Sequence, residues 1–124
     1  MTWKEEIFRA FLLAFGSLQI ITNLSYLLKN EGIELARRQH QELPSDTSNT
    51  KMKIKVICMF LVGVMFFAVS LISYILHDFY EEAIFTSLII FSIYALMEAL
   101  YYKYWKTTGF AIVTLILLLI YNVF

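Results

Sequence analysis

The segment VICMFLVGVMFFAVSLISYIL, residues 56–76, contains no charged side chain. The hydrocarbon core of a bilayer is about 30 Å thick, and about 20 residues of α-helix, each rising about 1.5 Å, are needed to cross it. Residues 56–76 are long enough and apolar enough, so we expect a transmembrane helix here.

The composition of the whole chain agrees with a membrane protein. Of the 124 residues, 60% are hydrophobic and 16% are charged, whereas soluble domains average about 45–50% and about 25%. These values exclude a disordered protein, a disulfide-stapled secreted domain and an ordinary cytosolic enzyme, because most side chains must face lipid or one another. The single cysteine, Cys58, has no disulfide partner within the chain, and a formal net charge of zero supplies no field that would attract nucleic acid.

Three further segments are comparable in length and hydrophobicity, namely residues 7–28, 83–102 and 107–124. We expect the first of them to remain a membrane helix rather than a cleaved signal peptide. Its apolar stretch is long, it contains Gln19 and Asn23, and no A-x-A cleavage site follows it. The sequence therefore predicts an all-α integral membrane protein, a single domain over residues 1–124, in which four transmembrane helices pack as a bundle.

The distribution of basic residues predicts the orientation in the membrane. Eight of the ten lysines and arginines follow the first or the third span, and the short loop between the second and third spans has none. The eight are Lys29, Arg37, Arg38, Lys51, Lys53, Lys55, Lys103 and Lys106. The positive-inside rule places such loops in the cytoplasm, so both termini are expected on the extracytoplasmic side of a cell membrane. The residue usage suggests a bacterial inner membrane.

The cytoplasmic loop, residues 29–55, is the largest polar segment. Residues 31–43 can form an amphipathic helix, and Arg37 and Arg38 on it would meet anionic lipid headgroups. Residues 44–50, rich in Ser and Thr, then end the helix and act as a flexible linker. Alternatively, the first span simply continues into the cytoplasm as a solvated helix.

Glu98 is the one carboxylate inside a predicted span. Ionisable groups within a membrane are costly and usually face the interior of a helix bundle. Side chains at spacings of four and three share its helix face; they are Ser87, Phe91, Tyr94, Tyr101 and Trp105. Three roles fit this position, namely a structural hydrogen bond to another helix, proton or cation coupling, or exposure at the membrane interface.

The first span offers polar partners for Glu98. One stripe of this helix carries Arg9, Gly16, Gln19, Asn23 and Tyr26. Asn23 and Tyr26 share a depth with Glu98, so we expect one of them to hydrogen-bond to it. Together with Gln19 and Tyr94 these residues form a predicted intramembrane polar seam. Small residues that would allow close contact between the first two spans are Gly16, Gly63 and Ser70.

The short second loop is acidic and holds His77, Asp78, Glu81 and Glu82. If the helices continue through it, His77 and Glu81 lie one turn apart, as do Asp78 and Glu82, and this spacing can hold a divalent cation. A solvated acidic cap is the more common role for such a run. The four residues are therefore weak candidates for metal ligands, and we expect no cofactor.

Patterns typical of a catalytic site are missing from the sequence. There is no H-E-x-x-H, no C-x-x-C and no Gly-rich phosphate loop. Cys58 and His77 are predicted near opposite membrane faces, and His40 stands alone in the cytoplasmic loop, where we expect a surface histidine. We therefore expect no enzymatic activity.

Two functions remain consistent with these patterns. The first is a small membrane protein that acts by helix–helix binding of a membrane partner or of itself, in an accessory, assembly or immunity-type role. The second is a small oligomeric transporter or channel that uses Glu98 as an intramembrane coupling carboxylate. In both, the lipid bilayer surrounds the chain and nucleic acid is not a partner.

Overall fold

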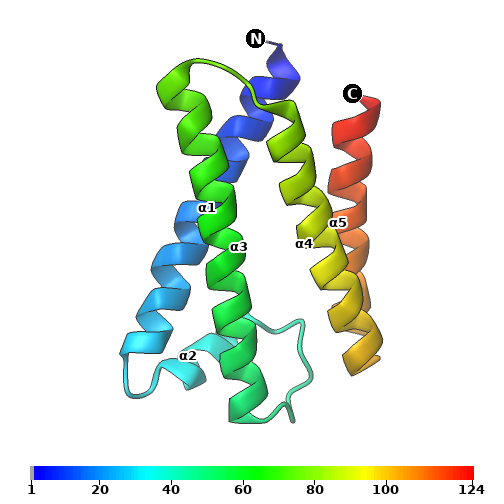
Figure 1. Ribbon diagram of the computed structural model, residues 1–124. Coiled ribbons are helices and arrows are strands. Elements are labelled where there is room, and N and C mark those ends of the chain that lie inside the picture. Colours follow the sequence, from blue (N-terminus) through cyan, green and yellow to red (C-terminus); the bar gives the residue numbers. More distant parts are fainter. Residues whose placement is uncertain (1) are drawn as a thin grey trace.

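The computed structural model describes residues 2–124, and this part of the chain folds into helices without any strand. The helices of this part are α1 (Trp3–Leu28), α2 (Gly32–Gln39), α3 (Asn49–Leu76), α4 (Glu81–Tyr102) and α5 (Trp105–Val123), labelled in Figure 1. The four longer ones are long and apolar enough to cross a membrane. They correspond to the four predicted spans, so the all-helical, multi-pass prediction is confirmed at this level.

The ends of the long helices follow from local chemistry. The Ser48 hydroxyl accepts a hydrogen bond from the backbone N–H of Lys51 and caps the start of α3. α3 therefore begins at Asn49 and not at Val56, which places Lys55 on the helix and not in the loop where we expected it. At the other ends, His77 and Lys103 have positive φ angles of 53° and 50°, and they terminate α3 and α4.

α1 and α3 cross at two glycines. A Cβ atom added to Gly16 would lie 2.7 Å from the backbone nitrogen of Phe67 and 2.8 Å from the carbonyl oxygen of Gly63. A Cβ on Gly63 would lie 2.9 Å from the Cβ of Gln19. No side chain fits between the helices at this point, so the close contact predicted from Gly16 and Gly63 is confirmed.

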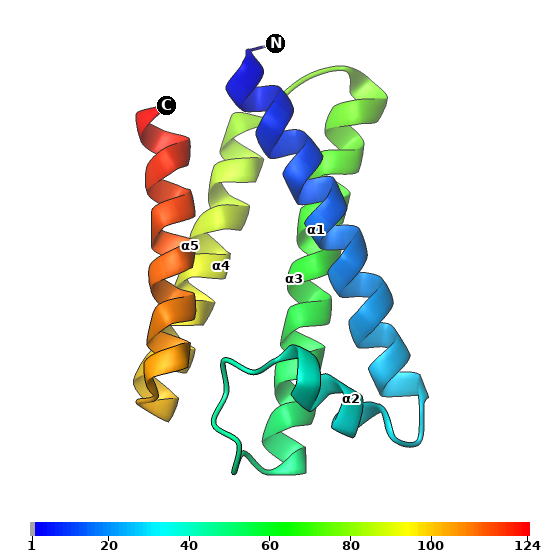
Figure 2. The same ribbon diagram turned by 180° about the vertical axis from the view of Figure 1, so that it is seen from behind.

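The long helices are arranged as two pairs, α1 with α3 and α4 with α5, and the contact between α3 and α4 is smaller than either. Figures 1 and 2 show the two pairs side by side, with α2 packed against the lower ends of α1 and α3. Aromatic rings join the pairs at mid-height. Phe91 of α4 lies 5.3 Å from Phe66 of α3, 5.9 Å from Phe15 of α1 and 5.5 Å from Phe110 of α5, measured between ring centroids.

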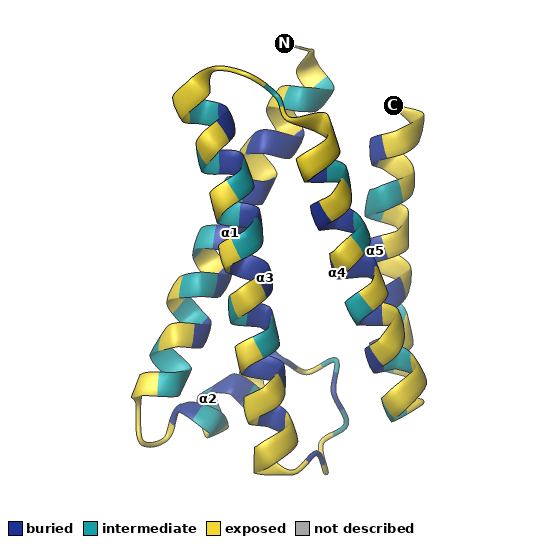
Figure 3. Ribbon diagram, in the orientation of Figure 1, coloured by how far each residue is buried: buried dark blue, intermediate teal, exposed yellow. Residues whose placement is uncertain are grey.

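Large apolar side chains cover the outer faces of the long helices. Figure 3 shows the exposed residues on the outside and the buried residues where the helices face one another. Ile21, Leu61 and Leu100 are examples, each more than half exposed. Such a surface is unfavourable in water and suits a hydrocarbon environment.

Candidate functional site

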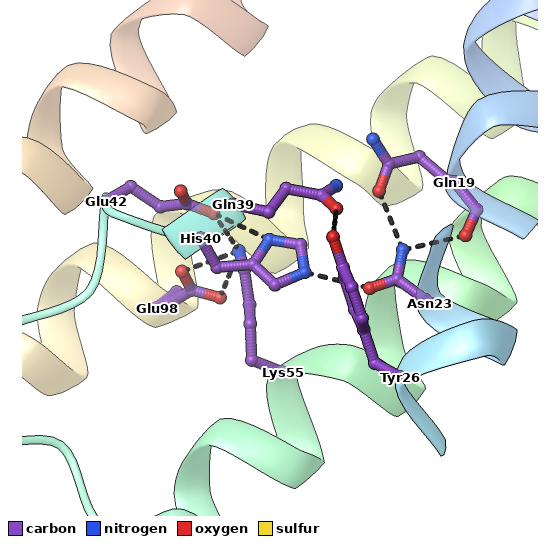
Figure 4. A network of polar contacts seen from close by, with 8 residues as sticks. All are labelled: Gln19, Asn23, Tyr26, Gln39, His40, Glu42, Lys55 and Glu98. Carbon is purple, nitrogen blue, oxygen red and sulfur yellow. Dashed lines mark hydrogen bonds and ion pairs between the residues drawn. The ribbon is translucent and has the colours of Figure 1, made fainter. Parts of the chain in front are cut away.

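A buried group of polar side chains lies at the end of the molecule that carries α2, and we call it the polar cluster (Figure 4). It consists of Gln19, Asn23, Tyr26, Gln39, His40, Glu42, Lys55 and Glu98. Lys55 is at its centre and only 2% exposed. Its Nζ atom lies 2.9 and 3.1 Å from the two carboxylate oxygens of Glu98 and 2.9 Å from Oε1 of Glu42.

The helices explain how these three charges meet. Lys55 lies on the buried face of α3, between Met52 and Met59, while Glu98 lies on the buried face of α4. Glu42 belongs to the connection that follows α2. The rings of Tyr94 and Phe110 lie 5.1 and 4.4 Å from the Lys55 ammonium. A buried lysine requires such partners, because an unpaired charge away from water is strongly destabilising.

His40 connects this ion pair network to α1. The side-chain amide of Asn23 donates to the backbone carbonyl of Gln19 at 2.8 Å, which fixes its orientation and directs Asn23 Oδ1 toward His40 Nε2, also at 2.8 Å. Because Oδ1 only accepts, Nε2 must carry a proton. The other ring nitrogen, Nδ1, lies 3.6 Å from Oε1 of Glu42. Both nitrogens of His40 therefore face oxygen atoms, and the ring joins Asn23 of α1 to the connection that follows α2.

Glu42 lies in the connection after α2, and the side chains around it set its ionisation. Burial raises the pKa of this carboxyl, but contact with His40 and the positive charge of Lys55 outweigh burial and lower the pKa from 4.5 to about 2. Glu42 is therefore a carboxylate at neutral pH. The ion pair between Glu42 and Lys55 holds the connection after α2 against α3.

The structure brings several residues of the predicted polar seam into the polar cluster, but with partners other than those expected. Gln19, Asn23 and Glu98 are buried on the expected faces of α1 and α4. The hydrogen bond expected from Asn23 or Tyr26 to Glu98 is wrong. Asn23 contacts His40 and Gln19, and the Tyr26 hydroxyl lies 2.5 Å from Oε1 of Gln39, to which it donates. Figure 4 shows the reason, since the end of α2 and the following residues lie between α1 and Glu98.

Four residues of the polar cluster are not among the site residues predicted from the sequence. Gln39 and Glu42 carry no prediction of their own, Lys55 is expected in the loop, and His40, expected at the surface, is buried at 3% exposure. A signal for Lys55 did exist. It follows Met52 by three positions and precedes Met59 by four, which is the spacing of the buried face of α3.

The other predicted site residues lie apart from the polar cluster. His77, Asp78, Glu81 and Glu82 are all exposed at the opposite end of α3 and α4. Within residues 2–124, no three metal-ligating side chains come close enough together to hold an ion. Of the two arginines expected at lipid headgroups, Arg37 is half-buried with its Nη2 atom 2.5 Å from Oδ1 of Asn49, whereas Arg38 is exposed.

A second buried charge lies near the N-terminal end of α1. Arg9 donates to Oε2 of Glu6 at 2.8 Å and to the carbonyl oxygen of Ser73 at 3.4 Å, and its guanidinium lies 4.0 Å from the ring of Tyr74. These contacts hold α1 against the last turn of α3. We assign Arg9 a structural role.

A groove of about 490 Å³ separates α3 from α4 beside the polar cluster. Its lining residues are Lys51, Ile54, Lys55, Cys58, Tyr94, Met97, Glu98, Tyr101 and Tyr102. Apart from the paired charges and Lys51, these side chains are apolar or aromatic. The groove exists because α3 and α4 contact each other much less than the helices within each pair.

Comparison of the chain with protein-family models, with curated proteins and with solved structures gave no match.

Proposed function

We propose that this chain is a non-enzymatic, multi-pass membrane protein that binds a transmembrane helix of another membrane protein in the groove between α3 and α4. The observation that carries the proposal is the smaller contact between the two helix pairs, which leaves this groove beside an already paired lysine and glutamate. A partner helix would complete the bundle without having to neutralise either charge of the Lys55–Glu98 pair.

The side chains that line the groove support a protein partner. Tyrosine and methionine are enriched where proteins contact one another, and this groove presents Met97 together with Tyr101 and Tyr102. The tyrosine hydroxyls can hydrogen-bond to polar groups of a neighbouring helix, as occurs between membrane helices. A lipid acyl chain offers no such groups.

The membrane disposition is part of the proposal. We place the end with α2 in the cytoplasm of a bacterial cell, with α2 at the level of the headgroups and both termini on the opposite side. Figure 1 shows the two termini at the same end of the molecule. A single cysteine introduced at Tyr80 in a Cys58→Ser background tests this. Labelling by an impermeant maleimide from the extracytoplasmic side is expected, and labelling only from the cytoplasmic side contradicts it.

Site-specific photo-crosslinking in native membranes tests the partner. A photoreactive residue at Met97, which lines the groove, is expected to capture a transmembrane segment of one membrane protein, identified by mass spectrometry. The same residue at Leu100, exposed on α4 but outside the groove, is the matched control. Co-expression of the identified partner should then protect Cys58 from a membrane-permeant maleimide. Capture of a second copy only, of lipid only, or equally from both positions contradicts the proposal.

Pairing of Glu98 weighs against the transporter alternative. A coupling carboxylate must gain and lose a proton or cation, but Glu98 has both oxygens within 3.1 Å of the Lys55 ammonium. We therefore expect purified protein in liposomes to show no proton or cation flux above that of empty liposomes. A flux abolished by Glu98→Gln would support the transporter instead.

A further inference from the structure

A second cavity, of about 340 Å³, lies at the same end of the molecule and is separate from the groove. The connection from α2 to α3 forms one wall, and the start of α5 forms the other. Figure 2 shows this connection extending from α3 toward the first turn of α5. The cavity thus joins the two helix pairs at the level where the headgroups of one leaflet would lie.

Positive charge dominates the cavity. Arg37 from α2 and Lys106 from α5 line it, although they lie far apart in the sequence, and no carboxylate is among its lining residues. Neither side chain forms an ion pair with an acidic residue in the described part of the chain. The N-terminus of α5, where Tyr104 provides no side-chain cap, adds the positive end of a helix dipole.

The hydrogen-bonding groups around these charges suit a phosphate. The contact between Arg37 and Asn49 engages one nitrogen of the guanidinium, which carries five N–H donors in all. Gln41, Ser45 and Tyr104 add neutral donors to the lining. Arginine with additional amide and hydroxyl donors is a common way to bind phosphate oxygens.

We propose that this cavity binds a phosphate group, carried either by an anionic phospholipid or by a soluble phosphorylated compound. Leu43 and Met52 form an apolar part of the lining, on which the glycerol end of a lipid could pack. Arg37, one of the two arginines expected at lipid headgroups, belongs to this site, whereas the exposed Arg38 does not. The site is independent of the partner helix proposed for the groove.

Binding to the purified, full-length protein in a neutral detergent tests the proposal. Short-chain phosphatidylglycerol, short-chain phosphatidylcholine and inorganic phosphate are the three probes, and native mass spectrometry and calorimetry measure their retention. Retention of phosphatidylglycerol but not of inorganic phosphate assigns the site to a headgroup. Comparable binding of inorganic phosphate assigns it to a soluble compound. Absence of binding by both overturns the proposal, as does equal retention of phosphatidylcholine.

Matched variants show whether the cavity itself is responsible. Arg37→Gln and Lys106→Gln are each expected to weaken binding by about tenfold, because each removes charge-assisted hydrogen bonds. Arg38→Gln and Lys103→Gln remove the same charges from the same end of the molecule outside the cavity, and should change binding by less than about twofold. Lys106→Arg should retain it, which also controls for folding. Equal losses in the cavity and control variants would mean general electrostatic attraction and would overturn the site.

Discussion

Replacing Lys55 by methionine removes the central charge of the polar cluster while keeping most of the side-chain volume. Lys55 is 2% exposed and forms contacts of 2.9 to 3.1 Å with Glu98 and Glu42. Its loss leaves the buried carboxylate of Glu98 and the partly buried carboxylate of Glu42 without the ammonium group that they share. Removing one partner from a buried ion pair costs about 3–5 kcal/mol, so we expect Lys55→Met to lower the free energy of unfolding by about that amount.

Reversible unfolding in mixed micelles, followed by far-UV circular dichroism as dodecyl sulfate is added, measures this change. Lys51→Met is the matched control, because Lys51 precedes Lys55 by one helical turn on α3 and is exposed. It should cost less than about 1 kcal/mol. Further replacement of both carboxylates, in Lys55→Met with Glu42→Gln and Glu98→Leu, should recover most of the loss, since an apolar substitute for a buried ion network is often tolerated.

If Lys55→Met and Lys51→Met have equal effects, water reaches the ion pair and Lys55 is not buried in the membrane-embedded protein. If the combined variant is no more stable than Lys55→Met alone, the loss comes from packing and not from unpaired carboxylates. Coupling between positions 55 and 98 in a double-mutant cycle should lie within about 0.5–3 kcal/mol.

Three further predictions use the same unfolding assay. Gly16→Ala places a Cβ 2.7 Å from the backbone of α3 and should lower the free energy of unfolding by about 1–3 kcal/mol through overpacking. Gly109→Ala is the control, because no atom lies within 4 Å of its new Cβ, and it should be neutral or slightly stabilising. Equal effects of the two variants would mean that α1 and α3 do not cross closely. The pKa of Glu42 is about 2 in the folded protein and 4.5 as a free side chain, so the stability that its carboxylate contributes is complete above pH 4.5 and should fall as the pH drops toward 2. Glu42→Gln should remove this part of the acid dependence. If the variant keeps the same dependence of unfolding free energy on pH, the lowered pKa of Glu42 is contradicted. Phe91→Ala should lower the free energy of unfolding by about 3–5 kcal/mol, because the Phe91 ring contacts the other three long helices. A loss below about 1 kcal/mol would mean that the two helix pairs do not meet at mid-height.

The glycine crossing and the buried face of α1 were predictable because both depend on short-range periodicity. Gly16, Gln19 and Asn23 repeat at helical spacing, so they share one face wherever the helix packs. The same reasoning found Glu98 on the buried face of α4. It failed for the partner of Glu98, because that partner depends on how the loop between α1 and α3 folds back.

The fold of the connection between α1 and α3 also explains why Lys55 is buried on α3 and does not lie in the loop, where the sequence predicted it. Lysine beside an apolar span is normally a residue of the aqueous interface, and the orientation rule treats it so. In the structure, Glu42 comes from the loop and Glu98 from α4, and each places a carboxylate oxygen within hydrogen-bonding distance of the same ammonium. Only this arrangement makes the burial of Lys55 favourable.

The sequence by itself determined that the chain has four helices long and apolar enough to cross a membrane, since a hydrocarbon environment imposes its requirement on each segment separately. The tertiary structure alone decided which charges meet, because Glu42, Lys55 and Glu98 belong to three different segments and come together only when those segments pack. It also decided that Arg37 and Lys106 share one cavity. The energy of a buried charge depends on the distance to its partners, and that distance is a property of the folded chain and not of the local sequence.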